Sequence, residues 1–464
     1  MDPYSTAIAA SVAKVPLLIN GRDYGGSHLF EVESPAAFPA WARTKPAVRR
    51  YILLETANVL ERRRREFANY MHIETGADVE AIKGFVIPLA SSMLRDIAGR
   101  IPSICGSVPV VEGKGQSAIV FKESMGSTVL LTTHICNTAP YISGIRAAAC
   151  ALAAGNTAVL LSSTQTPRCY WSIGRAFWEA GLPDGCLNII STCREDMPQI
   201  MNAMIGHPAI RKVNSTGSIY VGKQIAAICG MNLKPSLIDT MGQNYAIVCA
   251  DADVPVAVEG VLAGVMLNSY RIYMSTGRIL VDASIAEEFM ETLKYALSMT
   301  DAQVLPPIFV KAFIKSHVGS LITSAVECGA ELLHGKLETE PSCDGVLSIG
   351  PFVLANVNPN MRVWLEGEYT TLTACMLVRS DDEAVRIANS VGYGSSASVF
   401  TKDLRKGLAI AKQLEFGAVH INGMNKHDEP VLPYGGIKDS GWGQFNTEEG
   451  LNEYLVTNSV TWKD

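Results

Sequence analysis

Short apolar runs alternate with helical stretches through the middle of the chain, and this rhythm constrains the fold more than any other feature. After Gly126, four runs have the length and composition of buried strands: residues 127–132, 157–161, 187–190 and 212–214. Segments with helical periodicity separate these runs. Such a succession of strands and helices predicts a parallel sheet covered by helices on both faces. A second stretch of the same kind, with strands near 245–250, 279–281 and 374–378, extends to about Gly443.

Length, composition and charge indicate a large globular protein. A chain of 464 residues is too long for one ordinary core, so we expect two or three domains. Hydrophobic residues make up 48% and charged residues 18%, as in a compact folded chain. The net charge of -6 gives no reason to expect nucleic acid or an anionic membrane as partner. The longest apolar run is interrupted by Arg146 and Gly155, which argues against a membrane span.

The N-terminus and the cysteines indicate a cytoplasmic location. The first residues lack a basic segment followed by an apolar one, so we expect no signal peptide. The eleven cysteines include no CxxC pair, and we expect reduced, buried thiols without disulfides or a metal site. Residues 15–24 alternate around a glycine turn and predict a hairpin. One long helix is expected from about Lys45 to Gly76, with its run of four arginines on a solvated face.

Five motifs follow one another along most of the chain. They are RAAACALAAGNTAVL, STGSIYVGKQIA, ADADVPVAVEGVLAGVMLNS, YGSSASVFTKDL and HINGMNKHDEPVLPYGGIKDSGWGQF. Together they resemble the successive landmarks of the aldehyde dehydrogenase superfamily. HDEP and PYGGIKDSG resemble its salicylaldehyde- and vanillin-dehydrogenase-like branch. The resemblance implies an α/β fold with a doubly wound Rossmann-type domain, a second α/β catalytic domain and a small β oligomerisation arm. It also implies a homodimer or homotetramer.

The resemblance also places the domain boundaries. The cofactor-type domain is expected at 1–108 and 128–238, the catalytic-type domain at 239–445, and the arm at 109–127 and 450–464. The family normally has a further strand and helix start after Pro35, and these are missing here, so the first domain is truncated near its N-terminus. The β-branched tail is expected to form an edge strand that is added to another subunit.

The family reaction requires a cysteine nucleophile, an oxyanion-binding asparagine and a glutamate that activates water. The nucleophile segment here reads NSYRIYMST, with Tyr273 at the cysteine position. Tyrosine has a pKa of about 10 and is a poor nucleophile and acyl carrier, so thioester chemistry at this position is excluded. Asp239 stands at the glutamate position. Asn137 stands one position away from the family's oxyanion asparagine, in the tripeptide that begins at Cys136.

The nucleotide contacts that the resemblance implies are also changed. Leu161 replaces the lysine that binds the adenosine ribose, and Gly367 replaces the glutamate that binds the other ribose. Gly217 and Ser218 remain in a turn at a helix start, which also serves as a cap without any ligand. We therefore regard these two as vestigial and expect no cofactor: neither NAD nor NADP binds.

The replaced positions carry polar side chains, which favours a new reaction at the old site. The expected catalytic residues are Tyr273, Asp239, His134, Arg271 and Tyr270. The expected substrate-binding residues are Asn137, Thr138, Tyr369 and Asn422. His134 suits acid–base work near neutrality, and a tyrosine beside an arginine can donate to an enolate oxygen. The leading hypothesis is a non-redox enzyme of specialised metabolism that cyclises, isomerises, condenses or adds to an aromatic or polyketide-like carbonyl compound.

Two other interpretations stay open. The chain is an inactive scaffold or regulatory partner of an active homologue, which co-purification would support. Alternatively, it retains NAD(P)-dependent aldehyde dehydrogenase activity, with Cys136 as a displaced thiol. Cys136 is otherwise a small buried filler.

Overall fold

The first sheet has eight strands, and its parallel centre confirms the predicted alternation of strands and helices. The computed structural model describes residues 15–24, 34–133, 139–193, 195–240, 242–266, 275–301, 308–310, 312–335, 347–349, 352–366, 372–425 and 429–463. The strand order is β18-β8-β7-β4-β5-β6-β1-β2. The parallel strands are β4 (Val129–Thr133), β5 (Ala158–Leu161), β6 (Leu187–Ile190), β7 (Lys212–Gly217) and β8 (Ser236–Thr240). The antiparallel edge strands are β1 (Leu17–Ile19), β2 (Arg22–Tyr24) and β18 (Gly441–Trp442).

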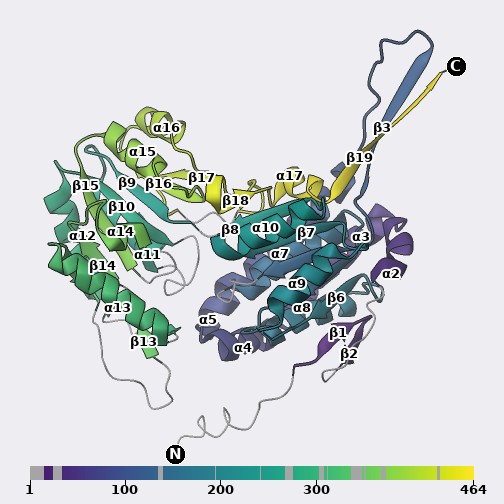
Figure 1. Cartoon of the computed structure of the whole chain (residues 1–464), viewed down its shortest axis with the longest axis horizontal. Helices are drawn as coiled ribbons and strands as arrows, with labels where there is room; N and C mark the ends of the chain where they lie inside the picture. Colours follow the sequence, from purple (N-terminus) through teal and green to yellow (C-terminus); the bar gives the residue numbers. More distant parts are fainter. Residues whose placement is uncertain are drawn as a thin grey trace, which may run out of the picture.

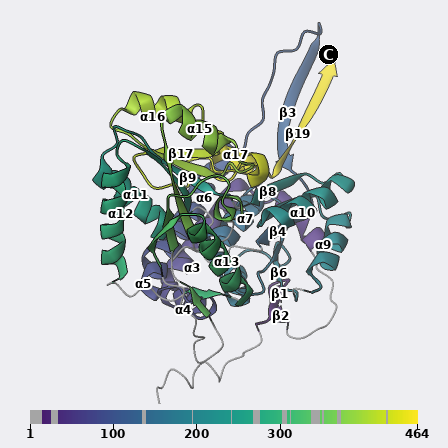
Figure 2. The ribbon, with the colours of Figure 1, turned by 60° about the vertical axis from the view of Figure 1, so that its left-hand side comes forward.

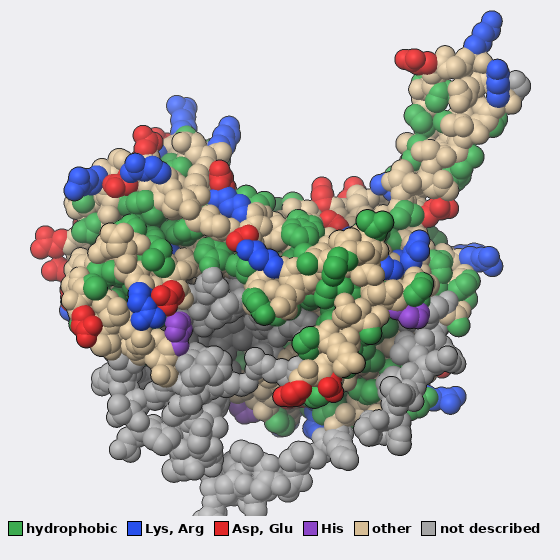
Figure 3. All heavy atoms as spheres, in the orientation of Figure 1, with side chains coloured by type: hydrophobic (Ala, Val, Ile, Leu, Met, Phe, Trp, Pro, Cys, Tyr) green, Lys and Arg blue, Asp and Glu red, His purple; other side chains and the backbone are tan. Residues whose placement is uncertain are grey.

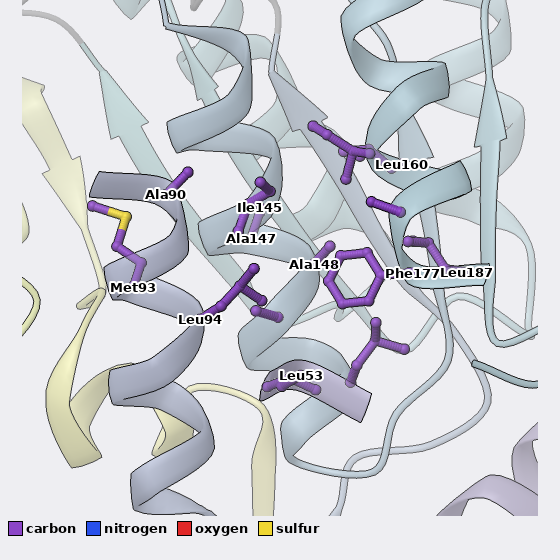
Figure 4. Close-up of a cluster of buried hydrophobic side chains, with 14 of the residues drawn as sticks. Leu53, Ala90, Met93, Leu94, Ile145, Ala147, Ala148, Leu160, Phe177 and Leu187 are labelled. Carbon is purple, nitrogen blue, oxygen red and sulfur yellow. The ribbon is translucent and has the colours of Figure 1, made fainter. Parts of the chain in front are cut away.

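Helices cover both faces of this sheet because side chains alternate along each strand. Val129 and Leu131 of β4 pack in one core cluster, whereas Leu130 between them packs in another. The first face is covered by α3 (Pro46–Arg62), α6 (Ile87–Arg100), α7 (Pro140–Ala153) and α8 (Pro167–Glu179). The second face is covered by α9 (Met197–Gly206) and α10 (Ile219–Met231). Figure 4 shows buried side chains of the first cluster, including Leu94 and Ile145. Strands buried on both faces tend to carry apolar residues throughout, as β5 does with the sequence AVLL, whereas β7 is equally buried but reads KVNSTG.

The long helix expected from Lys45 to Gly76 is two helices. α3 ends at Arg62, and α4 (Arg64–Thr75) begins after Arg63. Gly76 ends α4 in the left-handed conformation, with φ of 71°. The run lies on a face that is at least partly exposed, as expected; within it Arg63 pairs with Glu66 and with Glu179 of α8, and Arg64 pairs with Glu61.

The second sheet has the strand order β12-β14-β15-β10-β9-β16-β17. Its parallel strands are β9 (Asn244–Val248), β10 (Thr276–Asp282), β14 (Phe352–Ala355), β15 (Leu372–Val378), β16 (Ser396–Phe400) and β17 (Ala418–Ile421). β12 (Glu331–His334) adds to the edge antiparallel. One face packs on α11 (Val254–Met266) and α12 (Ala286–Asp301). Helices on the other face include α13 (Ala312–Glu327), α14 (Arg362–Glu366), α15 (Asp381–Asn389) and α16 (Leu404–Ala411).

Smaller elements complete the described chain. They are α2 (Ser34–Ala42), α5 (Val79–Ala81), the π-helix η1 (Ile82–Val86), η2 (Ile101–Ser103), η4 (Lys438–Ser440), α17 (Thr447–Asn452) and the ribbon of β11 (Ile308–Val310) with β13 (Leu347–Ile349). The two sheets with their helices form two lobes (Figures 1 and 2).

A two-stranded ribbon extends away from both lobes (Figures 1 and 2). It consists of β3 (Gln116–Ser124) and β19 (Leu455–Lys463), which pair antiparallel from Leu455↔Ser124 to Lys463↔Gln116. The expected terminal strand is therefore present, but it pairs within its own chain. The base of the ribbon is fixed to the first sheet, because Lys212 Nζ lies 2.5 Å from Glu453 Oε2 and Asn214 Nδ2 donates to the Tyr454 hydroxyl at 2.6 Å.

The sequence predicts no membrane span, no metal site and buried, reduced thiols. The described residues bear on each of these predictions. None of the helices described is long and apolar enough to cross a membrane. Within the described ranges, no group of three or more His, Cys, Asp and Glu is arranged to hold a metal ion. The described cysteines are free thiols; Cys105, Cys193 and Cys328 are exposed, so the expectation that the thiols are buried holds only for the others.

Candidate active site

The two sheets meet where the carboxyl edge of the first is joined to the amino edge of the second. β8 ends at Thr240 and β9 begins at Asn244, so a very short connection links them. In the first sheet the chain runs outward from β4 through β5 and β6, and then returns to place β7 on the other side of β4. Helices α7 and α10, which follow β4 and β7, cover opposite faces. Ligands of doubly wound folds bind at such a switch point, beyond the carboxyl ends of the strands.

Asp239, the residue predicted as an acid–base group, lies near the carboxyl end of β8 and is 2% exposed. Its Oδ1 accepts a hydrogen bond from the Tyr434 hydroxyl at 3.3 Å. Its backbone lies between Thr216 of β7 and Gly441 of β18. Gly441 has φ of 104°, and a Cβ there would lie 1.9 Å from the carbonyl oxygen of Ile238. Only glycine therefore permits β18 to hold this edge of the sheet beside the carboxylate.

A buried arginine completes the cluster around Tyr434. Arg146 of α7 is 2% exposed, and its guanidinium lies 4.9 Å from the Tyr434 ring centroid and 4.4 Å from that of Phe445. The two rings are stacked at 6.0 Å. Tyr434 thus contacts both the cation and the Asp239 carboxylate. Opposite charges in one buried cluster offset part of each other's desolvation cost.

The sequence interpretation missed Arg146, Tyr434 and Phe445 as site residues. Two signals were available. Arg146 is a lone charge in the otherwise apolar helix α7, and Tyr434 belongs to the PYGGIKDSG motif. Neither signal identifies the partner, because Tyr434 and Asp239 are 195 residues apart in the chain.

Asn422 lies in a different place from Asp239. It follows β17 at the carboxyl edge of the second sheet, with φ of 54°. Its Oδ1 accepts from the Thr401 amide at 3.0 Å, and its Nδ2 donates to the Thr401 carbonyl at 2.8 Å. Both ends of the amide hold the loop after β16, so the structure gives Asn422 a loop-stabilising role.

Gly217 and Ser218 lie at the end of β7 and at the N-cap of α10. The Ser218 hydroxyl accepts from the Val221 amide at 3.2 Å, as an N-cap does. Two buried hydroxyl groups lie near the carboxyl ends of the adjacent strands. Thr132 of β4 and Ser215 of β7 are register partners, and each is 1% exposed. Neither hydroxyl has a hydrogen-bond partner in the described part of the chain. Because buried hydroxyls are normally bonded, these residues fit the polar groups of a ligand at the switch point.

Leu161, the replacement for the family lysine, is fully buried in the cluster formed with α9 and α10. Its side chain packs in the core and offers no donor to a ribose. The remaining predicted site residues lie outside the described residues: Tyr273, His134, Arg271, Tyr270, Asn137, Thr138 and Tyr369, together with Cys136 and Gly367.

The chain is similar to characterised dehydrogenases over most of its length. A vanillin dehydrogenase of Pseudomonas fluorescens is 35% identical over 433 residues, which cover 92% of this chain and 87% of the relative. The crystal structure of a salicylaldehyde dehydrogenase from Pseudomonas putida G7, complexed with salicylaldehyde, is 27% identical with a TM-score of 0.89 and covers 97% of this chain and 98% of that one. The crystal structure of an NAD-dependent aldehyde dehydrogenase from Sinorhizobium meliloti is 25% identical with a TM-score of 0.87, covering 97% and 94%.

These comparisons correct the expected reaction. The non-redox cyclase, isomerase or lyase is contradicted, because relatives that share about a third of their residues with this chain over nearly its full length are dehydrogenases of aromatic aldehydes. The error arose from a few replaced side chains. Most of those lie outside the described residues, whereas the switch point that binds ligands in this fold is intact.

The expected absence of a nicotinamide nucleotide is also wrong, since similar structures are those of nucleotide-dependent dehydrogenases. That expectation rested on Leu161 and Gly367, two ribose positions. The phosphates of a dinucleotide are held largely by backbone N–H groups at a helix N-terminus, which require no particular side chain. The turn of Gly217 and Ser218 at α10 retains those groups.

A match to a family model confirms the family resemblance of the five motifs. The aldehyde dehydrogenase family model matches residues 32–460, which include the second sheet, the first sheet apart from β1 and β2, and most of the ribbon. The relatives confirm the similarity to the vanillin and salicylaldehyde dehydrogenase branch. The chain belongs to the aldehyde dehydrogenase family.

Proposed function

We propose that the chain oxidises an aromatic aldehyde to its carboxylic acid with a nicotinamide nucleotide as the hydride acceptor, and that the reacting species is the aldehyde hydrate. The observation that carries the proposal is Asp239, a buried carboxylate held by the Tyr434 hydroxyl beside the switch point. Because Tyr273 occupies the cysteine position, the reaction proceeds without a thioester.

The steps balance without a covalent bond to the protein. Water adds to the aldehyde carbon while Asp239 takes a proton from it, which leaves the anion of the hydrate with one hydroxyl and one alkoxide oxygen. Loss of a hydride from this carbon gives the carboxylic acid directly, and Asp239 returns its proton to solvent. A bound nicotinamide nucleotide would supply the hydride acceptor. Tyr273 supplies a phenol hydroxyl, which can donate a hydrogen bond to the carbonyl oxygen.

The aromatic substrate class is supported by the cluster next to Asp239. Arg146 places a cation beside the stacked rings of Tyr434 and Phe445, and such groups favour contact with an aromatic ring or a phenolic oxygen. The relatives are named for vanillin and salicylaldehyde, both of which are phenolic benzaldehydes. We therefore propose a hydroxylated benzaldehyde as substrate.

The first experiment combines calorimetric titration with NAD and NADP and a turnover assay with vanillin and salicylaldehyde. We expect nucleotide binding, acid and reduced nucleotide in equal amounts, and slow turnover, because conjugated aldehydes are poorly hydrated. Iodoacetamide treatment and Cys136→Ala should leave the rate unchanged. Inactivation by either would favour the displaced thiol instead. Nucleotide binding without any turnover, together with co-purification of an active homologue, would favour the scaffold and contradict the proposal.

We further propose that the chain works as a homodimer or homotetramer. Hydrophobic side chains are exposed along the ribbon of β3 and β19 (Figure 3). They include Phe121, Val460 and Trp462. An isolated two-stranded ribbon is marginal in water, so packing against another copy would stabilise it. Sedimentation equilibrium should give a multiple of 49.9 kDa. Deletion of residues 455–463 should lower that mass, and an unchanged mass would show that the ribbon does not assemble the subunits.

A further inference from the structure

Tyr434 reaches Asp239 from a segment that is only weakly held by its own strand. The strand in this segment, β18, consists of Gly441 and Trp442, which pair antiparallel with β8. The register of a strand is set mainly by the side chains of a buried face, and a two-residue strand that contains a glycine has little to set it. Other contacts must therefore hold the segment against the first sheet.

Two such contacts hold the beginning of the segment. The Thr240 hydroxyl donates to the Asp439 carbonyl, and Trp442 Nε1 donates to the Ser236 carbonyl at 3.0 Å. Trp442 is 49% exposed, so water competes for the second bond. Neither contact reaches the residues that follow β18.

Glu453 holds the residues that follow β18. Its Oε1 accepts from the Gln444 amide at 3.1 Å, and its Oε2 lies 2.5 Å from Lys212 Nζ. Lys212 begins β7, which lies between β4 and β8, and its side chain is 4% exposed. A buried ion pair adds little net stability, because both charges lose their hydration, and its best-attested use is to fix register. The pair thus ties Gln444 to the interior of the first sheet.

The residue after Gln444 carries this tether to Asp239. Phe445 exchanges two backbone hydrogen bonds with Tyr434, at 2.6 and 3.0 Å, and the two rings are stacked. The Tyr434 hydroxyl donates to Asp239 Oδ1 at 3.3 Å. This hydrogen bond is already longer than usual, so a small shift of the ring would break it. A displaced Phe445 would therefore displace the hydroxyl that faces the carboxylate.

We propose that Glu453 is a positioning residue for the proposed reaction: paired with Lys212, it holds Gln444 and Phe445 so that the Tyr434 hydroxyl stays bonded to Asp239. Glu453 acts through these residues and takes no part in the proton transfer. This inference rests on the proposed role of Asp239 as the general base.

The test replaces both charged residues together, as Lys212→Met with Glu453→Met. A single Glu453→Met would leave a buried ammonium without its partner and could prevent folding, whereas an apolar pair of similar size is often tolerated. The double variant should melt close to the parent, while kcat for vanillin falls about fivefold, as expected for the loss of one hydrogen bond. KM and NAD affinity should not change.

Hydrogen–deuterium exchange is a second readout, and it requires no turnover. In the double variant, the amides of residues 434–445 should exchange faster, while those of β4 and β5 stay as protected as in the parent. Faster exchange throughout the first sheet, with a lower melting temperature, would show that the pair only stabilises the fold and would overturn the inference.

Two comparisons complete the experiment. Lys294→Met with Glu331→Met removes an ion pair from the lobe of the second sheet, and it should leave kcat and the exchange of residues 434–445 unchanged. In a Tyr434→Phe background, removal of the Lys212 pair should cause no further loss, because both changes break the same bond.

Two kinetic results would contradict the role of Glu453. One is an unchanged kcat in a stable double variant, and the other is a loss that multiplies with that of Tyr434→Phe, to about 25-fold. If the parent oxidises no aldehyde, the proposed function itself fails. The exchange experiment would still decide whether Glu453 holds residues 434–445.

Discussion

Tyr273→Cys is expected to raise kcat for an aromatic aldehyde by about a hundredfold, which is close to 3 kcal/mol of barrier. A cysteine with a pKa near 8.5 supplies thiolate at neutral pH and attacks the carbonyl directly. The slow hydration step would no longer limit the rate. The residue that stores the acyl group would be restored on a chain that already carries the fold of its dehydrogenase relatives.

The measurement is the steady-state rate of NADH formation with vanillin, before and after iodoacetamide. The variant should become sensitive to the reagent, while the parent stays insensitive. Tyr270→Cys is the matched control, because it introduces the same thiol three positions earlier and should bring no gain. If Tyr273→Cys gains nothing although it binds the nucleotide as the parent does, then the missing thiol is not what limits the reaction, and the hydrate mechanism loses its premise.

Asp239→Asn is expected to lower kcat about 100- to 10,000-fold, the usual contribution of a general base. Asparagine retains the shape of the side chain and still accepts the bond from the Tyr434 hydroxyl, but it cannot take a proton. The expected signature is a large fall in kcat with NAD affinity unchanged. Thermal unfolding must be measured as well, because removing the carboxylate leaves Arg146 as a buried cation with less compensation.

Two further variants distinguish a loss of proton transfer by Asp239 from a loss of the structure around it. Tyr434→Phe removes only the hydroxyl that positions Asp239, so it should lower kcat by a few-fold and preserve the pH profile. Combining Asp239→Asn with Tyr273→Cys should trap an acyl-enzyme, visible as a mass increase, because water is no longer activated to release the acid. An active Asp239→Asn variant would remove Asp239 from the mechanism.

Much of the fold was predictable because it is encoded in local patterns. The buried strands of both sheets follow from short apolar runs, and the glycine turn at residues 15–24 gives the hairpin of β1 and β2. The break at Arg63 was not predictable. ERRRREF contains no helix breaker, and the pairing of Arg63 with Glu179 of α8 depends on how the helices pack.

The candidate site was likewise predictable only in part. Sequence motifs singled out Asp239 and placed Gly217 and Ser218 at a helix start; the structure puts Asp239 near the end of β8 and Ser218 at the N-cap of α10. The prediction that no nucleotide binds failed because it gave more weight to two replaced ribose side chains than to this helix start, whose backbone N–H groups require no particular side chain.

The sequence by itself determined the α/β architecture, the family and the carboxylate at position 239, because strand and helix periodicity and motif spacing are local properties of the chain. Only the tertiary structure decided that Arg146 lies beside the stacked rings of Tyr434 and Phe445, and that the Gln243 amide has no partner in the described chain while that of Asn244 is bonded. These outcomes depend on contacts between residues far apart in sequence. Such contacts are fixed by packing, and no local pattern encodes them.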